Sequence, residues 1–225
     1  MSALKSAYIN NLFQLNPDPP MSRIVFKMDV VRRVNPKIEE VPAIEGLKLI
    51  HPKVFPDERG FFSESYNVEE WRTKLGFEEP FLQDNHSFSK YGVIRGLHAQ
   101  KGMGKLVTVA VGKIYGEKFG IAKTGSSKAG SPTYGKWHGV LLDAREKNFF
   151  WIPDGFLHGF QCLSEDGAHV IYKCSAVYDP KTEFGINPLD EKIGVVWPIR
   201  DKTQWIISEK DAKSPSFGTL STANE

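Results

Sequence analysis

Short hydrophobic segments separated by turn-forming residues make up most of the chain. Each segment is about 4–10 residues long and rich in Val, Ile, Phe, Trp or Tyr, and Gly, Pro, Ser or Asp stands between consecutive segments. This pattern predicts β-strands at residues 47–50, 61–62, 81–89, 92–98, 105–111, 113–122, 135–142, 148–152, 159–163 and 168–176. Helical patterns do not alternate with these segments, so we expect an antiparallel sandwich or barrel and not a βαβ sheet.

One segment has the periodicity of an amphipathic helix, residues 68–75, in which Trp71 and Leu75 are spaced for one face. Residues 1–40 lack such periodicity and are predicted to be an N-terminal extension, although 24–31 could add a strand to a sheet edge. Residues 41–225 should form a single domain, and 208–211 should open a short polar tail.

Composition narrows the possible functions. Of the 225 residues, 40% are hydrophobic and 25% are charged, which is enough for a packed core, and the net charge of +2 is too small to indicate a nucleic-acid partner. No segment approaches the roughly 18 apolar residues of a membrane span. Cys162 and Cys174 are expected to be buried free thiols in a reducing compartment, although a disulfide between neighbouring strands is conceivable. We therefore expect a cytoplasmic protein with neither nucleic acid nor membrane as a partner.

Candidate chemistry begins with Arg95-Gly96-Leu97-His98 at the end of a predicted strand. Alternation would place Arg95 and Leu97 on one face and His98 on the other, unless Gly96 permits a bulge. Glycine beside an arginine and a histidine fits a backbone that approaches a ligand, but a surface arginine and a core histidine would fit as well.

A second histidine ends the segment Trp151-Ile-Pro-Asp-Gly-Phe-Leu-His158. The Pro-x-Gly-x-x-His spacing matches the second half of the cupin metal motif. The first half requires His-x-His and a glutamate, whereas Ala99 and Gln100 follow His98. We therefore expect no metal, and His158 is interpreted as a hydrogen-bond donor to substrate or to another side chain.

Two further side chains complete a possible acid–base set. Lys105 opens an apolar strand after Gly-Met-Gly, where its ammonium could reach an oxyanion inside a barrel or simply be solvated. Tyr172 lies within another apolar strand, as a proton donor or as a core tyrosine. Proton abstraction next to a carbonyl needs a base, a cation for the enolate, and an acid on the opposite face.

Several longer motifs follow one another in a fixed order over residues 47–215: Phe-Pro-Asp-Glu-Arg-Gly-Phe-Phe-Ser-Glu-Ser-Tyr (55–66), Gln-Asp-Asn-His-Ser (83–87), Arg-Gly-Leu-His (95–98), Gly-Lys-Leu-Val (104–107), Ser-Pro-Thr-Tyr-Gly-Lys-Trp (131–137), Trp-Ile-Pro-Asp-Gly-Phe-Leu-His-Gly-Phe (151–160), Tyr-Lys-Cys (172–174), Trp-Pro (197–198) and Ser-Glu-Lys-Asp (208–211). This series resembles the dTDP-4-dehydrorhamnose 3,5-epimerases. The resemblance implies an all-β, cupin-type antiparallel jelly-roll barrel with one or two short helices. It also implies a homodimeric isomerase that uses neither a metal nor a nicotinamide cofactor.

The resemblance also implies roles for individual side chains. His98 corresponds to the base that removes the proton next to the C4 ketone, Asp211 to the carboxylate that orients its imidazole, and Tyr172 to the acid on the opposite face. Lys105 and His158 correspond to groups around the ketone oxygen. Nucleotide and pyrophosphate contacts would come from Arg59, Glu64, Gln83, Asn85, Arg95, Glu183 and Lys210, with Arg59 and Glu64 supplied by a partner subunit.

Some features depart from the family pattern and bear on the substrate. Only six residues separate the predicted base from the predicted lysine, a short loop that also occurs in relatives acting on GDP-heptoses. Gly116 and Gly120 stand where the family has aspartates, and Val177 replaces the first of two tyrosines, leaving Tyr178.

We therefore expect a nucleotide-sugar epimerase that inverts C3, C5 or both on a 4-keto sugar through an enolate, with dTDP-4-dehydro-6-deoxy-D-glucose as the first candidate substrate. One alternative is a single-site epimerase of a GDP- or CDP-linked sugar. Another is a non-catalytic cupin that binds sugar nucleotides, and a third is a metal-dependent cupin oxygenase. Deuterium wash-in into the sugar would distinguish an epimerase from the non-catalytic binding protein, and metal analysis of the purified protein would identify the oxygenase.

Overall fold

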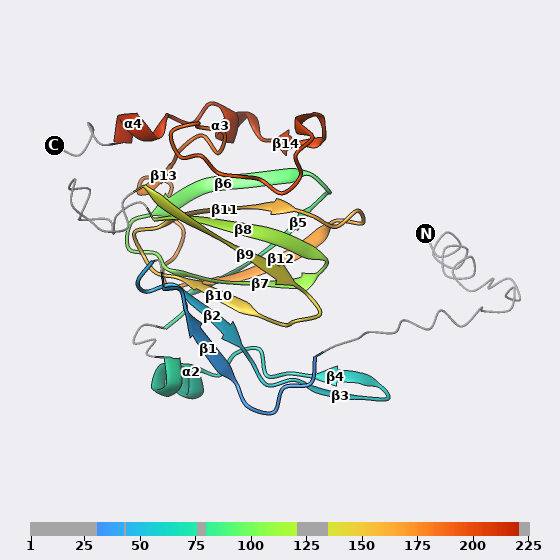
Figure 1. Ribbon diagram of the computed structural model, residues 1–225. Coiled ribbons are helices and arrows are strands. Elements are labelled where there is room, and N and C mark those ends of the chain that lie inside the picture. The colour runs from blue at the N-terminus through green and yellow to red at the C-terminus, as the bar shows by residue number, and fades with distance from the viewer. Residues whose placement is uncertain (1–30, 43, 76–79, 121–134, 221–225) are drawn as a thin grey trace, which may run out of the picture.

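The computed structural model describes residues 31–42, 44–75, 80–120 and 135–220, which fold into two facing β-sheets (Figure 1). The first sheet has six strands in the order β1 (Lys37–Glu40), β2 (Lys48–His51), β10 (Phe149–Ile152), β7 (Lys105–Val111), β12 (Ala168–Cys174) and β5 (Gln83–Ser89). The second has the order β13 (Glu183–Gly185), β6 (Val93–Gln100), β11 (Leu157–Cys162), β8 (Lys113–Gly120) and β9 (Lys136–Asp143), with β14 (Ile206–Ile207) beside β6. The β14–β6 pair is parallel, and the other described strand pairs are antiparallel. This is the predicted cupin-type jelly-roll barrel.

The hydrophobic core lies between the two sheets, because alternate residues of a strand point to the same face. Phe150 and Val170 of the first sheet meet Ile114 and Leu142 of the second in one cluster, and none of the four is more than 2% exposed. Burial of each such side chain contributes about 1.5–3 kcal/mol. The core therefore fixes which residues of every strand face inward, including the polar residues farther along the same strands.

The predicted amphipathic helix is present as α2 (Val68–Leu75), outside the first sheet. Asn67 caps its N-terminus, since its Oδ1 accepts two backbone N–H groups at 3.1 and 3.2 Å. Trp71 is buried edge-on against Phe149, with ring centroids 5.2 Å apart. The side chain of Leu75 lies outside the described part of the chain.

Each predicted strand segment contains a strand, with ends displaced by at most two residues where both ends are described. The pattern missed β1, β3, β13 and β14, which are only two to four residues long. Strand β1 pairs with β2, so the last residues assigned to the extension belong to the sheet edge. Residues 24–30 of the possible added strand lie outside the described residues.

The prediction of a polar tail at 208–211 is wrong. Ser208 caps the short helix α3 (Glu209–Ala212) by accepting the Asp211 backbone N–H at 3.0 Å. Asp211 is only 4% exposed and its helix packs against β6. A buried carboxylate is tolerated here because its oxygens have hydrogen-bond donors. The 3-10 turn η1 (Lys202–Gln204) and helix α4 (Phe217–Leu220) flank this segment.

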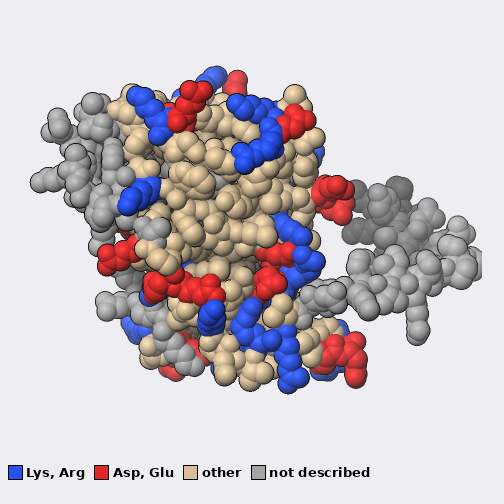
Figure 2. All heavy atoms as spheres, viewed as in Figure 1, with Lys and Arg blue, Asp and Glu red and all other residues tan. Residues whose placement is uncertain are grey.

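Strands β3 (Phe55–Asp57) and β4 (Gly60–Phe62) form a hairpin that projects from the end of the barrel opposite β6, β13 and α3 (Figure 1). On the face shown in Figure 2, Lys and Arg are interspersed with Asp and Glu above and below a broad uncharged middle. None of the helices in the described ranges is long and apolar enough to cross a bilayer.

Candidate active site

A bulge in β6 brings Arg95 and His98 to the inner face of the same sheet. Arg95 pairs with Phe160 of β11 and His98 pairs with His158, so three residue steps of β6 match two steps of β11. Gly96 makes this possible at φ +112°, where an added Cβ would lie 2.6 Å from the Gly159 Cα. Simple alternation would have separated the arginine from the histidine, and the bulge that Gly96 could permit is present.

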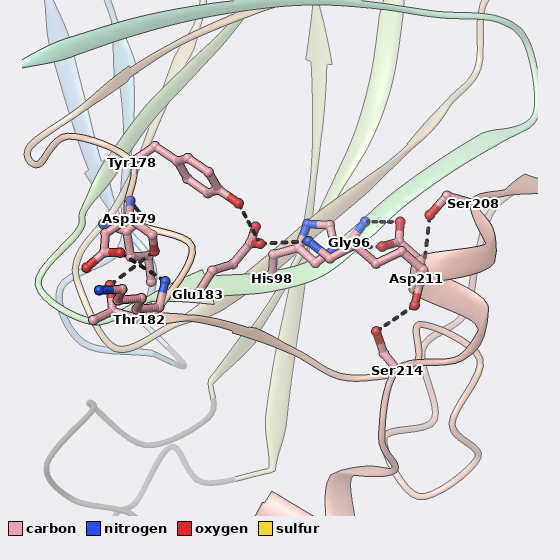
Figure 3. Close-up of polar contacts among 12 residues, drawn as sticks. Gly96, His98, Tyr178, Asp179, Thr182, Glu183, Ser208, Asp211 and Ser214 are labelled. Carbon is pink, nitrogen blue, oxygen red and sulfur yellow. Dashed lines mark hydrogen bonds and ion pairs between the residues drawn. The ribbon is translucent and has the colours of Figure 1, made fainter.

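His98 of β6 and Asp211 of α3 form a hydrogen-bonded pair (Figure 3). The His98 Nε2 lies 2.7 Å from the Asp211 Oδ1, and the backbone N–H of Gly96 donates to Oδ2 at 3.4 Å. Since a carboxylate accepts, Nε2 carries the proton in the neutral ring and Nδ1 keeps its lone pair. No described residue forms a hydrogen bond with Nδ1, and the His98 side chain is 26% exposed. This nitrogen is therefore available to take a proton.

A lysine and a second histidine meet beside this pair. The Lys105 Nζ lies 2.7 Å from the His158 Nε2, while the His158 Nδ1 faces the Phe156 carbonyl oxygen at 3.4 Å. A protonated Lys105 donates to Nε2, which leaves the ring proton on Nδ1. Burial lowers the pKa of Lys105, although neighbouring Cys174 and Glu183 act in the opposite direction. The pair can present positive charge to an oxyanion.

Tyr172 faces this cluster from the first sheet. The Lys105 Nζ is 5.5 Å from the centre of the Tyr172 ring, and burial raises the pKa of the phenol. A phenol that stays protonated at neutral pH can donate a proton. Because β12 and β6 belong to opposite sheets, Tyr172 and His98 approach the interior from opposite sides.

Gln83 and Asn85 lie on β5 next to the tyrosine strand. Asn85 is the direct partner of Tyr172 and Gln83 that of Cys174. The Gln83 amide donates to the Asn85 Oδ1 at 2.9 Å, and the Asn85 amide donates to the Cys174 Sγ at 3.4 Å. Cys162 and Cys174 are both buried free thiols. Sequence reasoning did not place Cys174 beside Lys105, although the two are cross-strand partners.

Glu183 lies on the side of His98 away from Asp211 (Figure 3), and it forms an ion pair with Lys210 at 2.6 Å. The Tyr178 hydroxyl also donates to Glu183, at 3.0 Å. Burial alone would raise the pKa of Glu183, but these two hydrogen bonds outweigh it and the pKa is lowered. The Tyr178 backbone N–H donates to Gln83 at 2.8 Å, which joins this group to β5. Arg95 bonds to the Ser89 hydroxyl and lies near enough to Tyr172 to influence its titration.

Arg59 and Glu64 do not join this cluster. Arg59 lies at the hairpin turn with its side chain 84% exposed, and it forms a bidentate ion pair with Asp57. Glu64 is exposed after β4, where it accepts a hydrogen bond from Asn67 at 3.4 Å. Of the twelve predicted site residues, these two alone lie on the far side of the molecule.

The inner cluster holds an oriented imidazole, a cation and a protonated phenol, which suits removal and return of a proton at a carbon next to a carbonyl. In the described part of the chain, no three His, Cys, Asp or Glu side chains gather as possible metal ligands. Sequence reasoning missed the contribution of Ser208, which caps the helix that carries the carboxylate. Its signal was Ser-x-x-Asp at 208–211, a helix-start pattern.

Known proteins resemble this chain in both sequence and fold. A family model described as dTDP-4-dehydrorhamnose 3,5-epimerase matches residues 42–219. The chain is 46% identical over 176 residues to the dTDP-4-dehydrorhamnose 3,5-epimerase of Salmonella typhimurium, covering 77% of this chain and 91% of that one. The structure resembles that of dTDP-6-deoxy-D-glucose-3,5-epimerase from Legionella pneumophila in complex with dTDP-4-keto-L-rhamnose, with a TM-score of 0.75, 40% identity, and coverage of 83% and 95%. It also resembles ChmJ, a 3'-monoepimerase from Streptomyces bikiniensis in complex with dTDP-quinovose, with a TM-score of 0.73, 28% identity, and coverage of 82% and 90%.

The jelly-roll barrel and its inward acid–base cluster define an isomerase, a nucleotide-sugar epimerase. The chain belongs to the dTDP-4-dehydrorhamnose 3,5-epimerase family.

Proposed function

We propose that the protein inverts both C3 and C5 of dTDP-4-dehydro-6-deoxy-D-glucose. The observation that carries this proposal is the 2.7 Å contact between His98 and Asp211, which leaves a basic nitrogen inside the barrel opposite Tyr172. The complex of the Legionella relative with dTDP-4-keto-L-rhamnose supports the choice of nucleotide and sugar.

In the proposed reaction, the His98 Nδ1 removes the proton from the carbon next to the C4 ketone. Asp211 stabilises the imidazolium that forms, because its carboxylate accepts the Nε2–H bond throughout. Electron density moves onto the ketone oxygen, where Lys105 and His158 stabilise the enolate. Tyr172 then protonates the carbon from the opposite side, which inverts its configuration. His98 releases its proton to solvent and Tyr172 regains one from solvent, and a second cycle at the other carbon completes the reaction.

The remaining polar groups are proposed to hold the nucleotide part of the substrate. Gln83, Asn85 and Arg95 lie around Tyr172, and the Glu183–Lys210 pair lies around His98. Lys210 is 67% exposed, so its ammonium can exchange the glutamate for a diphosphate oxygen at little desolvation cost.

We further propose that the active unit is a homodimer in which the β3–β4 hairpin docks on a second copy. Phe55, Phe61 and Phe62 are 41%, 38% and 68% exposed on this hairpin. An isolated two-stranded hairpin with exposed phenylalanines gains stability when a partner covers it. Docking would deliver Arg59 and Glu64 to the partner's pocket. Light scattering measures the assembly directly, and a fully active monomer would contradict this part.

A cytoplasmic location belongs to the same proposal. The two buried free thiols, Cys162 and Cys174, support a reducing compartment. Fractionation of cells that produce the protein tests the location.

Incubation in D2O tests the reaction. The protein is given dTDP-, GDP- or CDP-linked 4-keto-6-deoxyglucose, and NMR locates the deuterium that enters the sugar. We expect deuterium at C3 and C5 of the dTDP substrate, with inversion at both carbons. Exchange only with the GDP- or CDP-linked sugar would contradict the assigned substrate, and no exchange with any of the three would favour a binding protein.

Epimerisation at a single carbon is the second candidate function, favoured by the likeness to the 3'-monoepimerase ChmJ. The same NMR experiment separates the two candidates. A monoepimerase would incorporate deuterium with inversion at C3 alone.

A further inference from the structure

Gly185 faces the predicted base from the neighbouring strand. It is the direct cross-strand partner of His98 in the β13–β6 pair. The two strands are tied together beside it, because Leu97 and Ile186 exchange backbone hydrogen bonds of 3.3 and 3.0 Å. The backbone of residue 185 therefore lies close to the imidazole and cannot retreat without breaking the pair.

The space at this position admits no side chain. A Cβ on Gly185 would lie 2.7 Å from the Leu97 carbonyl oxygen and 3.0 Å from the His98 Cδ2. The φ angle of Gly185 is outside the left-handed region, so the backbone conformation does not require glycine. The absent side chain matters here because of the room it leaves for the ring.

The crowded ring atom is the one next to the hydrogen-bonding nitrogen. Cδ2 is bonded to Nε2, which donates to Asp211 at 2.7 Å. Asp211 is itself fixed by the Gly96 N–H and by the cap of its helix. A methyl group at position 185 would displace the ring while the carboxylate stays in place. Both the Nε2–Asp211 bond and the position of Nδ1 would change.

We propose that Gly185 is a positioning residue that seats the His98 ring against Asp211 and so aims Nδ1 at the substrate carbon. This inference rests on the proposed role of His98 as the base. Gly185 does not touch the reacting atoms and acts only through the imidazole.

The test compares Gly185→Ala with Gly116→Ala. Both glycines lie in strands of the second sheet, but a Cβ at Gly116 would meet nothing nearer than the Val140 carbonyl oxygen at 3.6 Å. We expect kcat of Gly185→Ala to fall by up to about 100-fold with KM nearly unchanged, since about 100-fold is the cost of misplacing a catalytic group by about 1 Å. Gly116→Ala should keep the wild-type kcat. Thermal unfolding of both variants shows whether each is folded at the assay temperature.

Nitrogen-15 NMR of the histidine rings reports the base itself. In the wild type the His98 ring signals should show the proton on Nε2, and in Gly185→Ala this signature should change. If the wild type catalyses no exchange but the ring signature still changes, the positioning holds and the proposed function fails. If the wild type is active and Gly185→Ala keeps both its kcat and its ring signature, the positioning role is overturned.

A double-mutant cycle with Asp211→Asn provides the remaining control. Because Gly185 acts through the His98–Asp211 contact, the loss caused by Gly185→Ala should largely disappear in the Asp211→Asn background. Equal losses in both backgrounds would show that alanine disturbs the barrel in general and would contradict the inference. If Gly185→Ala is unfolded at the assay temperature, its ring signature is measured at a lower temperature at which it is folded. A changed signature would then support the positioning role, and an unchanged signature would overturn it.

Discussion

The two ends of the molecule carry residues predicted for one reaction, but they are built in opposite ways. Around His98, three elements meet, and the carboxylate partner is 4% exposed with its hydrogen bonds made within the chain. On the β3–β4 hairpin, Arg59 is 84% exposed and its partner is Asp57, two residues away on the same hairpin. One end is complete in a single chain, while the other presents charged and aromatic groups outward.

This difference separates proton transfer from substrate binding. A base needs a fixed orientation, which buried hydrogen bonds to a rigid strand provide. A group that recognises the nucleotide can be brought in by a second copy, because its position is set when the two chains associate. Changes at His98, Asp211 or Tyr172 should therefore affect kcat, and changes at the hairpin should affect KM and depend on assembly.

The largest effect is expected from His98→Ala. Loss of the general base should lower the rate of deuterium exchange by about 10²–10⁴-fold or more at each carbon that the wild type exchanges. NMR of the sugar in D2O measures the exchange, and light scattering should show an unchanged assembly, because the hairpin is untouched. Exchange at the wild-type rate would remove His98 from the mechanism.

Tyr172→Phe sharpens the assignment within the barrel end. His98 should still remove and return a proton on its own side, so deuterium exchange persists while net inversion falls by about 10²-fold or more. A merely structural tyrosine would instead cost about 1 kcal/mol of stability from one lost hydrogen bond, with stereochemistry unchanged. Retained inversion in a stable variant would point to water or Tyr178 as the acid.

Mixing a variant of the barrel end with a variant of the hairpin, at a substrate concentration well below the KM of the hairpin variant, tests the comparison of the two ends directly. In a dimer of one His98→Ala chain and one Arg59→Ala chain, one pocket combines an intact base with an intact hairpin from the partner. Random reassociation of equal amounts should restore up to about a quarter of the wild-type activity. The activity of a dimer of two Arg59→Ala chains is the baseline from which recovery is measured. Subunit exchange is verified separately. If exchange has occurred and activity does not recover, Arg59 does not act across subunits.

The smallest effect concerns the alkaline side of the pH profile. Burial lowers the pKa of Lys105 from the ordinary lysine value of 10.5. As pH rises through this lowered pKa the ammonium loses its proton, so stabilisation of the enolate is complete below it and lost above it. We expect kcat to decline at a lower pH than an exposed lysine would allow. In Lys105→Arg the decline should disappear from the accessible range, and an unaltered decline would assign it to another group.

The sequence alone was sufficient for the longer strands of the barrel, and ten of the twelve predicted site residues lie together in the structure. In β12 the residues of one face are more buried than those of the other, whereas β10 is a short, wholly apolar strand that packs on both faces. Strands β1, β3, β13 and β14 could not be recognised, because two to four residues carry too little periodicity. They exist through pairing with longer strands, which is a tertiary effect.

Within the site, residue types were easier to predict than their neighbours. The order of the motifs was enough to point to His98, Lys105 and Tyr172, but it left open whether a bulge turns Arg95 inward. The order of the motifs also pointed to His98 as the partner of Asp211, although residues 208–211 were assigned to a polar tail. The space beside Gly185 depends on the register of β13 against β6, and a single sequence does not contain that register.

The position of Asp211 late in the chain has a consequence for how activity first arises. The base and its carboxylate are separated by 113 residues, and β13 with every earlier barrel strand is made before α3. At ribosomal speed this is an interval of about 6–20 s. A nascent chain, or one cut short after β13, lacks Asp211, the carboxylate that orients the His98 ring. Under the proposed mechanism, docking of α3 is then the step that completes the catalytic pair, and chains that lack α3 have no epimerase activity.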